Sequence, residues 1–288
     1  MVELSRIEKR EGNNLASELL FCCPKCGGAL TELGAFAKCP LGHSFDKSKY
    51  GYYNLLLSNT SGTHGDNKEM VLARRAFLGA GYYEPLAKRL SEIAASLTDQ
   101  SGALLDVGCG EGYYTVRLAE ALKARNNSTR VAAFDISRDA VRELLRKEKS
   151  ISAAVASAYA VPVSDGAFST VVNAFSPFSR EETVRALASG GHFIMAIPER
   201  DHLFELKEIL YETPYKNEVK DSGIEGLTLA HDERLTYKME LGSREDISAL
   251  FKMTPYAYRT PRSAAERLSE YTSLTVTADF HIYVYRKD

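Results

Sequence analysis

Short apolar runs alternate with amphipathic segments through the middle of the chain. Runs of four to seven residues predict buried β-strands at 103–107, 130–135, 151–156, 170–174 and 192–197. Between several of these runs, apolar residues recur at helical spacing and predict helices at 113–125, 138–148 and 180–188. Repeated strand–helix units predict an α/β fold, in which a parallel sheet carries helices on both faces and the crossovers are right-handed.

The pattern changes on either side of this core. Met70, Ala73 and Phe77 recur at helical spacing and predict a helix over 69–79, while the polar, turn-rich stretch 58–68 predicts a linker or loop. Towards the end of the chain, apolar and polar residues alternate with the period of half-buried antiparallel strands, in 235–241 and 274–284. We expect these strands at one edge of the sheet or as a cover over its top.

Composition narrows the class of protein. The 288 residues are 44% hydrophobic and 26% charged, as in an ordinary soluble globular protein. No apolar run reaches the roughly 18 residues of a membrane span, and the first residues do not resemble a signal peptide, so a cytoplasmic protein without a membrane partner is expected. The formal net charge of −2 gives no overall basic signature of a nucleic-acid binder, although a local basic patch is enough for binding.

Four of the five cysteines lie close together near the start of the chain. Cys23 and Cys26 form a C-x2-C pair, and Cys39 and His43 form a C-x3-H pair after an interval of twelve residues. Two such turns can converge on one tetrahedral zinc ion, and four protein ligands make the site structural rather than catalytic. Free cysteines beside a packed histidine are the alternative. Cys22 is a less favourable ligand, because pairing it with Cys26 needs a C-x3-C spacing.

These patterns divide the chain into four parts. Residues 1–20 are expected to be an N-terminal lead-in, 21–57 a zinc-binding module, 58–102 a linker with helices, and 103–288 the α/β domain.

A glycine-rich loop follows the first strand of the predicted sheet. Asp106, Gly108, Gly110 and Gly112 form the pattern D-x-G-x-G-x-G, and Asp135 ends the second strand. Glycines here allow a sharp turn and a close approach of a ligand, because the carboxyl ends of parallel strands are where such sheets bind ligands. Asp135 is placed to accept hydrogen bonds from two ribose hydroxyls; the alternative is a carboxylate that caps the following helix.

The spacing also indicates which nucleotide-like ligand binds. A dinucleotide site has the pattern G-x-G-x-x-G and holds a pyrophosphate, whereas this loop has G-x-G-x-G flanked by Asp106 and Glu111. Negative charge disfavours a pyrophosphate and suits a cationic aminoacyl sulfonium. The loop therefore favours S-adenosylmethionine over NAD.

Several stretches together resemble the bacterial 23S ribosomal RNA guanine-N1 methyltransferases, the group that includes a tylosin-resistance methylase. They are the cysteine and histidine knuckle with its continuation through 45–56, the run Ala73-Arg-Arg-Ala-Phe-Leu78 with Tyr83, the loop Asp106–Thr115, and the later stretches 202–207 and 253–259. The similarity extends from about residue 21 to the end of the chain.

The resemblance implies a class I (Rossmann-like) methyltransferase fold with a small N-terminal zinc-binding domain that helps to hold a ribosomal RNA hairpin. It places Tyr83, Gly110, Glu111 and His202 at the cofactor. Together with the loop and strand-end residues, the predicted cofactor-binding set is Tyr83, Asp106, Gly108, Gly110, Glu111, Asp135 and His202. For His202 alone, a histidine that hydrogen-bonds to its own turn is the simpler interpretation.

The expected activity is methylation of guanine N1 in a hairpin loop of 23S ribosomal RNA. Residues 173–178 lie where the target base should dock, so Phe175 or Phe178 could stack on it, unless both are ordinary core residues. The sequence offers no evident general base. Arg74 and Arg75, with Lys47 and Lys49 of the zinc module, could contact phosphates, although a solvated helix face explains the two arginines equally well.

Three alternatives stay open at this point. The chain could methylate another RNA, methylate a small molecule, or bind RNA without catalysis while retaining the fold. The zinc module argues against a small substrate, and the intact glycine loop with Asp135 argues against loss of cofactor binding. Neither the particular guanine nor the oligomeric state follows from the sequence, so a homodimer that helps to wrap the RNA is an open alternative to a monomer.

Overall fold

Two β-sheets organise the computed structural model, which describes residues 17–57, 65–100, 102–125, 128–219 and 223–288. The small antiparallel sheet has the order β1-β2-β3-β4 and is built from β1 (Ser17–Cys22), β2 (Ala29–Glu32), β3 (Phe36–Lys38) and β4 (Ser44–Asp46). Its first strand begins at Ser17, inside the stretch that the sequence predicted to be a lead-in.

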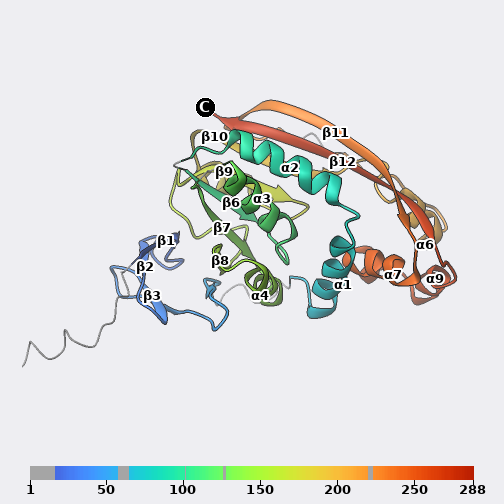
Figure 1. The fold of residues 1–288 in the computed structure, drawn as a ribbon, viewed down its shortest axis with the longest axis horizontal. Helices are drawn as coiled ribbons and strands as arrows, with labels where there is room; N and C mark the ends of the chain where they lie inside the picture. Colours follow the sequence, from blue (N-terminus) through green and yellow to red (C-terminus); the bar gives the residue numbers. More distant parts are fainter. Residues whose placement is uncertain (1–16, 58–64, 101, 126–127, 220–222) are drawn as a thin grey trace, which may run out of the picture.

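The large sheet has the order β11-β12-β10-β9-β6-β7-β8-β5. Its strands are β5 (Tyr53–Asn54), β6 (Ala103–Val107), β7 (Arg130–Asp135), β8 (Ser152–Val155), β9 (Phe168–Ala174), β10 (Leu187–Pro198), β11 (Leu227–Leu241) and β12 (Leu274–Lys287). The pairs among β5 to β10 are all parallel, and β8-β7-β6-β9-β10 follow the 3-2-1-4-5 order of a doubly wound sheet. The predicted parallel sheet is therefore confirmed. The predicted antiparallel strands form one edge, where β12 pairs with both β10 and β11 (Figure 1).

Helices cover both faces of this sheet. They are α1 (Lys68–Gly79), α2 (Glu84–Leu97), α3 (Tyr113–Ala124), α4 (Arg138–Lys147), α5 (Arg180–Ala186), α6 (Phe204–Leu210), α7 (Arg244–Met253), α8 (Tyr256–Arg259) and α9 (Arg262–Leu268). One apolar core contains buried residues of α1 to α4, α6 and α7, and the core on the opposite face contains Ala186 of α5. The side chains of Asn67, Ser137, Ser179 and Ser243 cap α1, α4, α5 and α7 by accepting a backbone N–H of the first turn.

The helix predicted over 180–188 ends earlier, at Ala186, because the buried Leu187 already pairs with Phe168 as the first residue of β10. The helix predicted over 69–79 is confirmed as Lys68–Gly79, with Ala80 as its C-cap. Helices α7 to α9 had no sequence expectation. Among the residues described, none of the helices has the length and apolarity needed to cross a bilayer.

The small sheet is attached to the edge of the large one that β8 and β5 form. Strand β5 pairs with β8 in parallel, and the backbone N–H of Cys22 donates to the carbonyl of Pro162 at 2.7 Å. Phe21 and Leu30 are 1% and 0% exposed and belong to the same core as Phe134 of β7. Strand β5, which follows the small sheet in the chain, thus covers the edge of β8, and the small sheet shares its core with the large domain.

Gly112 lets α3 and α4 pack closely. It has φ +85°, and a Cβ at this position would overlap the Leu144 side chain and lie 3.1 Å from the Leu144 Cα.

Gly112→Ala combines a left-handed backbone with overpacking, so we expect about 2–4 kcal/mol of destabilisation in urea unfolding. Gly81→Ala is the matched control, because Gly81 has φ +86° and nothing lies within 4 Å of its added Cβ. That control should lose only about 1 kcal/mol; equal losses would contradict the packing argument.

Candidate functional site

The four predicted metal ligands come together at one end of the small sheet. The ligand atoms of Cys23, Cys26, Cys39 and His43 all lie within 4.8 Å of one another. The Cys26 and Cys39 sulfurs are 3.6 Å apart, and His43 Nδ1 lies 3.5 Å from Cys23 Sγ and 3.4 Å from Cys39 Sγ. These separations suit one tetrahedral ion with bonds of about 2.0–2.3 Å. Cys22 points elsewhere, with its sulfur 3.0 Å from Ser164 Oγ.

Tight turns aim these ligands at one point. The backbone N–H groups of Cys23 and Gly27 donate to Gly28 and Cys23 carbonyls at 2.8 Å, and the N–H of Gly42 donates to Cys39 at 2.9 Å. Burial opposes ionisation of Cys39, but the backbone N–H of His43 and neighbouring donors lower the pKa of this thiol to about 6. A readily ionised thiol is a good zinc ligand, because the thiolate is the form that binds metal.

A second group of predicted residues surrounds the glycine loop at the carboxyl ends of β6 and β7. The backbone N–H groups of Gly108 and Cys109 both donate to the carbonyl of Phe134 at 3.0 Å. Gly108 has φ +73° and Gly110 has φ +53°, which is the left-handed region that favours glycine. The loop is therefore folded back against the next strand instead of continuing away from β6.

Asp135 holds the loop in this position. Its Oδ2 accepts the backbone N–H of Gly110 at 2.9 Å, and its Oδ1 accepts the N–H of Ser137 at 2.7 Å. Burial raises the pKa of Asp135, while these two N–H groups oppose the rise. The carboxylate therefore caps the local turn, and its predicted contact with a ribose stays a prediction.

The acidic pair Asp106 and Glu111 is less negative than the sequence argument assumed. Asp106 is 2% exposed, accepts the Thr115 hydroxyl at 2.6 Å, and has a pKa raised to about 7 by burial. Glu111 is also 2% exposed, and its Oε2 pairs with Lys147 on α4. Its Oε1 is buried without a hydrogen-bond partner. Asp106 is thus paired with α3, whereas Glu111 has one carboxylate oxygen without a partner.

Arg74 of α1 lies over the glycine loop. A Cβ on Gly110 would have Arg74 Nη1 as its nearest neighbour, at 3.6 Å, so no backbone covers this face of the loop. Arg74 is held by an ion pair with Asp66 at 2.5 Å and by the Met253 carbonyl at 3.3 Å. The flexible Arg74 side chain, and not backbone, is therefore what lies over Gly110. Arg75 instead pairs with Glu143 and stays 55% exposed.

Tyr83 and His202 meet although 119 residues separate them in the chain. Tyr83 Oη lies 3.2 Å from His202 Nε2, and both side chains are buried. The backbone N–H of Asp279 donates to His202 Nδ1 at 3.3 Å, so the ring proton resides on Nε2 and is donated to Tyr83. Burial lowers the pKa of His202 to about 3, which keeps the ring neutral.

Aromatic rings connect this pair to the end of β9. Phe175 follows β9 with φ +65°, an unusual backbone for a residue other than glycine. Its ring centroid lies 6.2 Å from both Tyr83 and Tyr114, and 5.4 Å from Phe280. Strained backbone at the end of a central strand is typical of a functional site. Phe175 therefore lies beside Tyr83 on one side and beside Tyr114, at the start of α3, on the other.

Phe178 belongs to the other face of the sheet. Its ring lies 5.2 Å from Phe193, and it lines a cleft of about 780 Å³ together with Arg180 and Lys216. Of the two phenylalanines that the sequence offered for base stacking, Phe175 is the one beside Tyr83 and the glycine loop.

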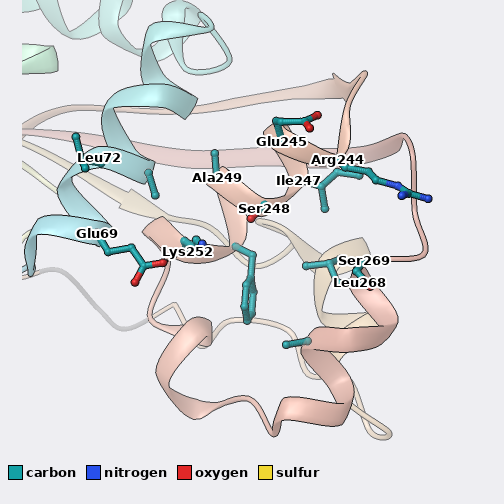
Figure 2. A pocket seen from close by; sticks show the side chains of 13 residues that line it. Glu69, Leu72, Arg244, Glu245, Ile247, Ser248, Ala249, Lys252, Leu268 and Ser269 are labelled. Carbon is teal, nitrogen blue, oxygen red and sulfur yellow. Dashed lines mark hydrogen bonds and ion pairs between the residues drawn. The ribbon is translucent and has the colours of Figure 1, made fainter.

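A further cleft, of about 710 Å³, lies between α1, α7 and α9, and none of the predicted metal or cofactor residues lines it. Figure 2 shows Glu69 of α1 beside Lys252 of α7, with which it forms an ion pair at 2.8 Å. The glycine loop is not part of this hollow, so size alone does not identify the site.

The chain has the fold and the chemical groups of a class I methyltransferase joined to a zinc ribbon. Residues 104–191 match the family described as a methyltransferase domain, and residues 21–60 match the zinc-ribbon family described as "RlmA, N-terminal". S-adenosylmethionine fits the glycine loop, since the loop offers Gly110, which only the Arg74 side chain covers, the strand-end Asp135, and the Glu111 Oε1 that has no partner.

The chain belongs to the family of 23S rRNA (guanine-N1)-methyltransferases. A Bacillus subtilis protein named "Putative 23S rRNA (guanine-N(1)-)-methyltransferase YxjB" is 30% identical over 278 residues, covering 93% of this chain and 97% of that protein. A Micromonospora griseorubida protein of the same description is 30% identical, covering 92% and 96%. The Streptomyces fradiae "23S rRNA (guanine(748)-N(1))-methyltransferase" is 34% identical over 191 residues, covering 65% and 66%.

Removing one metal ligand should abolish zinc binding by the ribbon. In Cys39→Ser, we expect the zinc content, measured by atomic absorption, to fall to background and the melting temperature to drop, because the metal contributes folding free energy to a very small module. Cys22→Ser is the matched control, since Cys22 only approaches Ser164 and a hydroxyl can replace that contact. A metal-free Cys22→Ser protein, or a metal-loaded Cys39→Ser protein, would contradict the assigned ligand set.

His202 should make the fold acid-sensitive. Its folded pKa of about 3 lies below the unfolded value of about 6.5, so its stabilising effect is complete above pH 6.5 and is lost as the pH falls towards 3. At about 1.4 kcal/mol per pH unit, the wild type should lose about 2–3 kcal/mol more between pH 7 and 4.5 than His202→Asn, which cannot titrate. His231→Asn, changed at an exposed position on β11, should behave like the wild type in these denaturant titrations. Equal acid sensitivity of all three proteins would show that His202 is not the group responsible.

Proposed function

We propose that the chain transfers a methyl group from S-adenosylmethionine to N1 of a guanine in a hairpin loop of 23S ribosomal RNA. The observation that carries the proposal is the near full-length relationship to proteins of that name, over 93% of this chain, combined with an intact glycine loop and zinc ribbon.

The cofactor would lie along the carboxyl ends of β6 and β7. Gly108 and Gly110 give close approach, Asp135 accepts from the ribose hydroxyls, and the free Oε1 of Glu111 accepts from a cationic group. Asp106 acts from behind the loop by fixing Thr115. The pair Tyr83 and His202 contacts the aminoacyl end, with the neutral imidazole orienting the tyrosine hydroxyl. The bound cofactor supplies an electrophilic methyl on a sulfonium.

The target guanine would stack beside Phe175. This residue stands at the carboxyl end of β9, which neighbours β6 in the sheet, so a base on its ring lies next to the cofactor. Alignment of N1 with the sulfonium methyl supplies much of the rate in a displacement of this kind. A base can reach such a position only when it is turned out of the RNA stack, as the unpaired bases of hairpin loops readily are.

A basic surface between the zinc ribbon and α4 would hold the RNA backbone. Lys49 lies 5.2 Å from the centre of the Tyr50 ring, and the guanidinium groups of Arg142 and Arg146 lie 5.7 and 5.6 Å from the same ring. These three cations gather on one aromatic residue, although Arg142 also pairs with Asp139 and Arg146 with Glu143, and they are our candidate for the local basic patch that a net charge of −2 conceals. Phosphate contacts here would position the hairpin without reading its sequence.

Transfer of labelled methyl to unmodified 23S rRNA tests the proposal. We expect a reverse-transcription stop at a single hairpin guanine, because N1-methylguanine cannot form a Watson–Crick pair.

Asp135→Asn should weaken cofactor binding about 10–100-fold, as expected for a lost charged hydrogen bond. Asp139→Asn, which alters a carboxylate paired with Arg142 in the first turn of α4, should not.

The same transfer reaction can also contradict the proposed substrate and the proposed position of methylation. Tight cofactor binding without label in the RNA would overturn the assignment of 23S rRNA as substrate. Label at another base, or at another position of guanine, would overturn the assignment of N1.

A further inference from the structure

Tyr114 carries a buried hydroxyl that no group in the described part of the chain satisfies. It lies in the first turn of α3, directly after the glycine loop. Its Oη is shielded from solvent and has no hydrogen-bond partner. Leaving a buried hydroxyl unpaired costs about 1–3 kcal/mol, so a native protein that keeps one has a use for it or a partner that arrives later.

The neighbouring tyrosines are satisfied. Tyr83 contacts His202 at 3.2 Å, Tyr237 donates to the Tyr82 carbonyl at 2.9 Å, and Tyr113 donates to Glu84 at 3.2 Å. Tyr114 therefore stands out within an aromatic cluster whose other hydroxyls have partners. Simple core packing would be served equally well by phenylalanine at this position.

The location of Tyr114 connects it with the reacting groups. Its ring lies 6.2 Å from Phe175, on which the target base is proposed to stack. Its backbone is two residues beyond Gly112, where the loop that holds the cofactor ends. A group between these two features borders the place where guanine and sulfonium must meet.

We propose that the Tyr114 hydroxyl donates a hydrogen bond to O6 of the target guanine, an inference that rests on the function proposed above. In the reaction the N1–CH3 bond forms, the S–CH3 bond breaks, and the N1 proton leaves to solvent while the sulfonium becomes a neutral thioether. As N1 loses its proton, negative charge develops on O6, and a fixed donor stabilises it. Tyr114 keeps its own proton throughout.

The protonation state of Tyr114 agrees with this role. Burial raises the pKa of its hydroxyl well above 10, so the side chain is a neutral donor at physiological pH and not a general base. A donor to O6 lowers the pKa of guanine N1 in the complex, which would assist a site that has no evident base.

Tyr114→Phe separates this role from packing. At saturating cofactor and RNA, we expect single-turnover methylation of 23S rRNA to slow about 100-fold at pH 7, which is typical for loss of one donor to a developing oxyanion. The rising limb of the pH–rate profile should move to higher pH, because N1 then loses its proton less readily. Cofactor affinity should be unchanged, and the melting temperature should stay the same or rise, because an unpaired buried group has been removed.

Tyr113→Phe is the matched control, as it removes a hydroxyl that is one residue away but paired with Glu84. It should leave the pH–rate profile in place. An unshifted profile in Tyr114→Phe would overturn the inference. Weaker cofactor binding with an unchanged rate at saturation would also overturn it, by assigning the hydroxyl to the cofactor. If the wild type itself fails to methylate 23S rRNA, the proposed function fails first and this inference with it.

Discussion

The contact on which the site depends is the carboxylate of Asp135 with the backbone N–H groups of Gly110 and Ser137. It joins the turn after β6 to the turn after β7, so that both strand ends present their backbone to the same point. Because a carboxylate withdrawn from water is costly unless it is hydrogen-bonded, the two N–H groups and the half-buried carboxylate stabilise one another. Gly108, Gly110 and Gly112 make the required left-handed turns.

The zinc ribbon and the large sheet stabilise each other. Strand β8 would expose an edge, and the ribbon is too small to fold on its own apolar core. The pairing of β5 with β8, and the burial of Phe21 and Leu30 in the core beneath β7, resolve both. The ribbon is therefore fixed relative to α4, which is what allows Lys49 to join Arg142 and Arg146 around Tyr50.

The sequence predicted what depends on local pattern. Strand and helix periodicity located the parallel core, and spacing alone identified Cys23, Cys26, Cys39 and His43 as one cluster. The direction in which each side chain points could not be predicted from the local pattern. Asp106 and Glu111 look alike in sequence, but Asp106 accepts from Thr115 of α3, whereas Glu111 pairs with Lys147 of α4. Arg74 over Gly110, the Tyr83–His202 contact and helices α7 to α9 follow only from long-range packing.

Two unpartnered buried atoms lie on either side of Gly112, namely Oε1 of Glu111 and Oη of Tyr114. Asp106, Asp135, Tyr83 and His202 all have hydrogen-bond partners, whereas these two atoms, carried by residues within one stretch of four, have none. One is an acceptor suited to a cation, and the other is a donor suited to a developing anion. A methyl transfer from a sulfonium to a base nitrogen has one of each, and it transfers positive charge away from the first as negative charge grows near the second. On the proposed function, an unmet acceptor and an unmet donor beside the glycine loop are what a site organised around a transition state, instead of around the free fold, would contain.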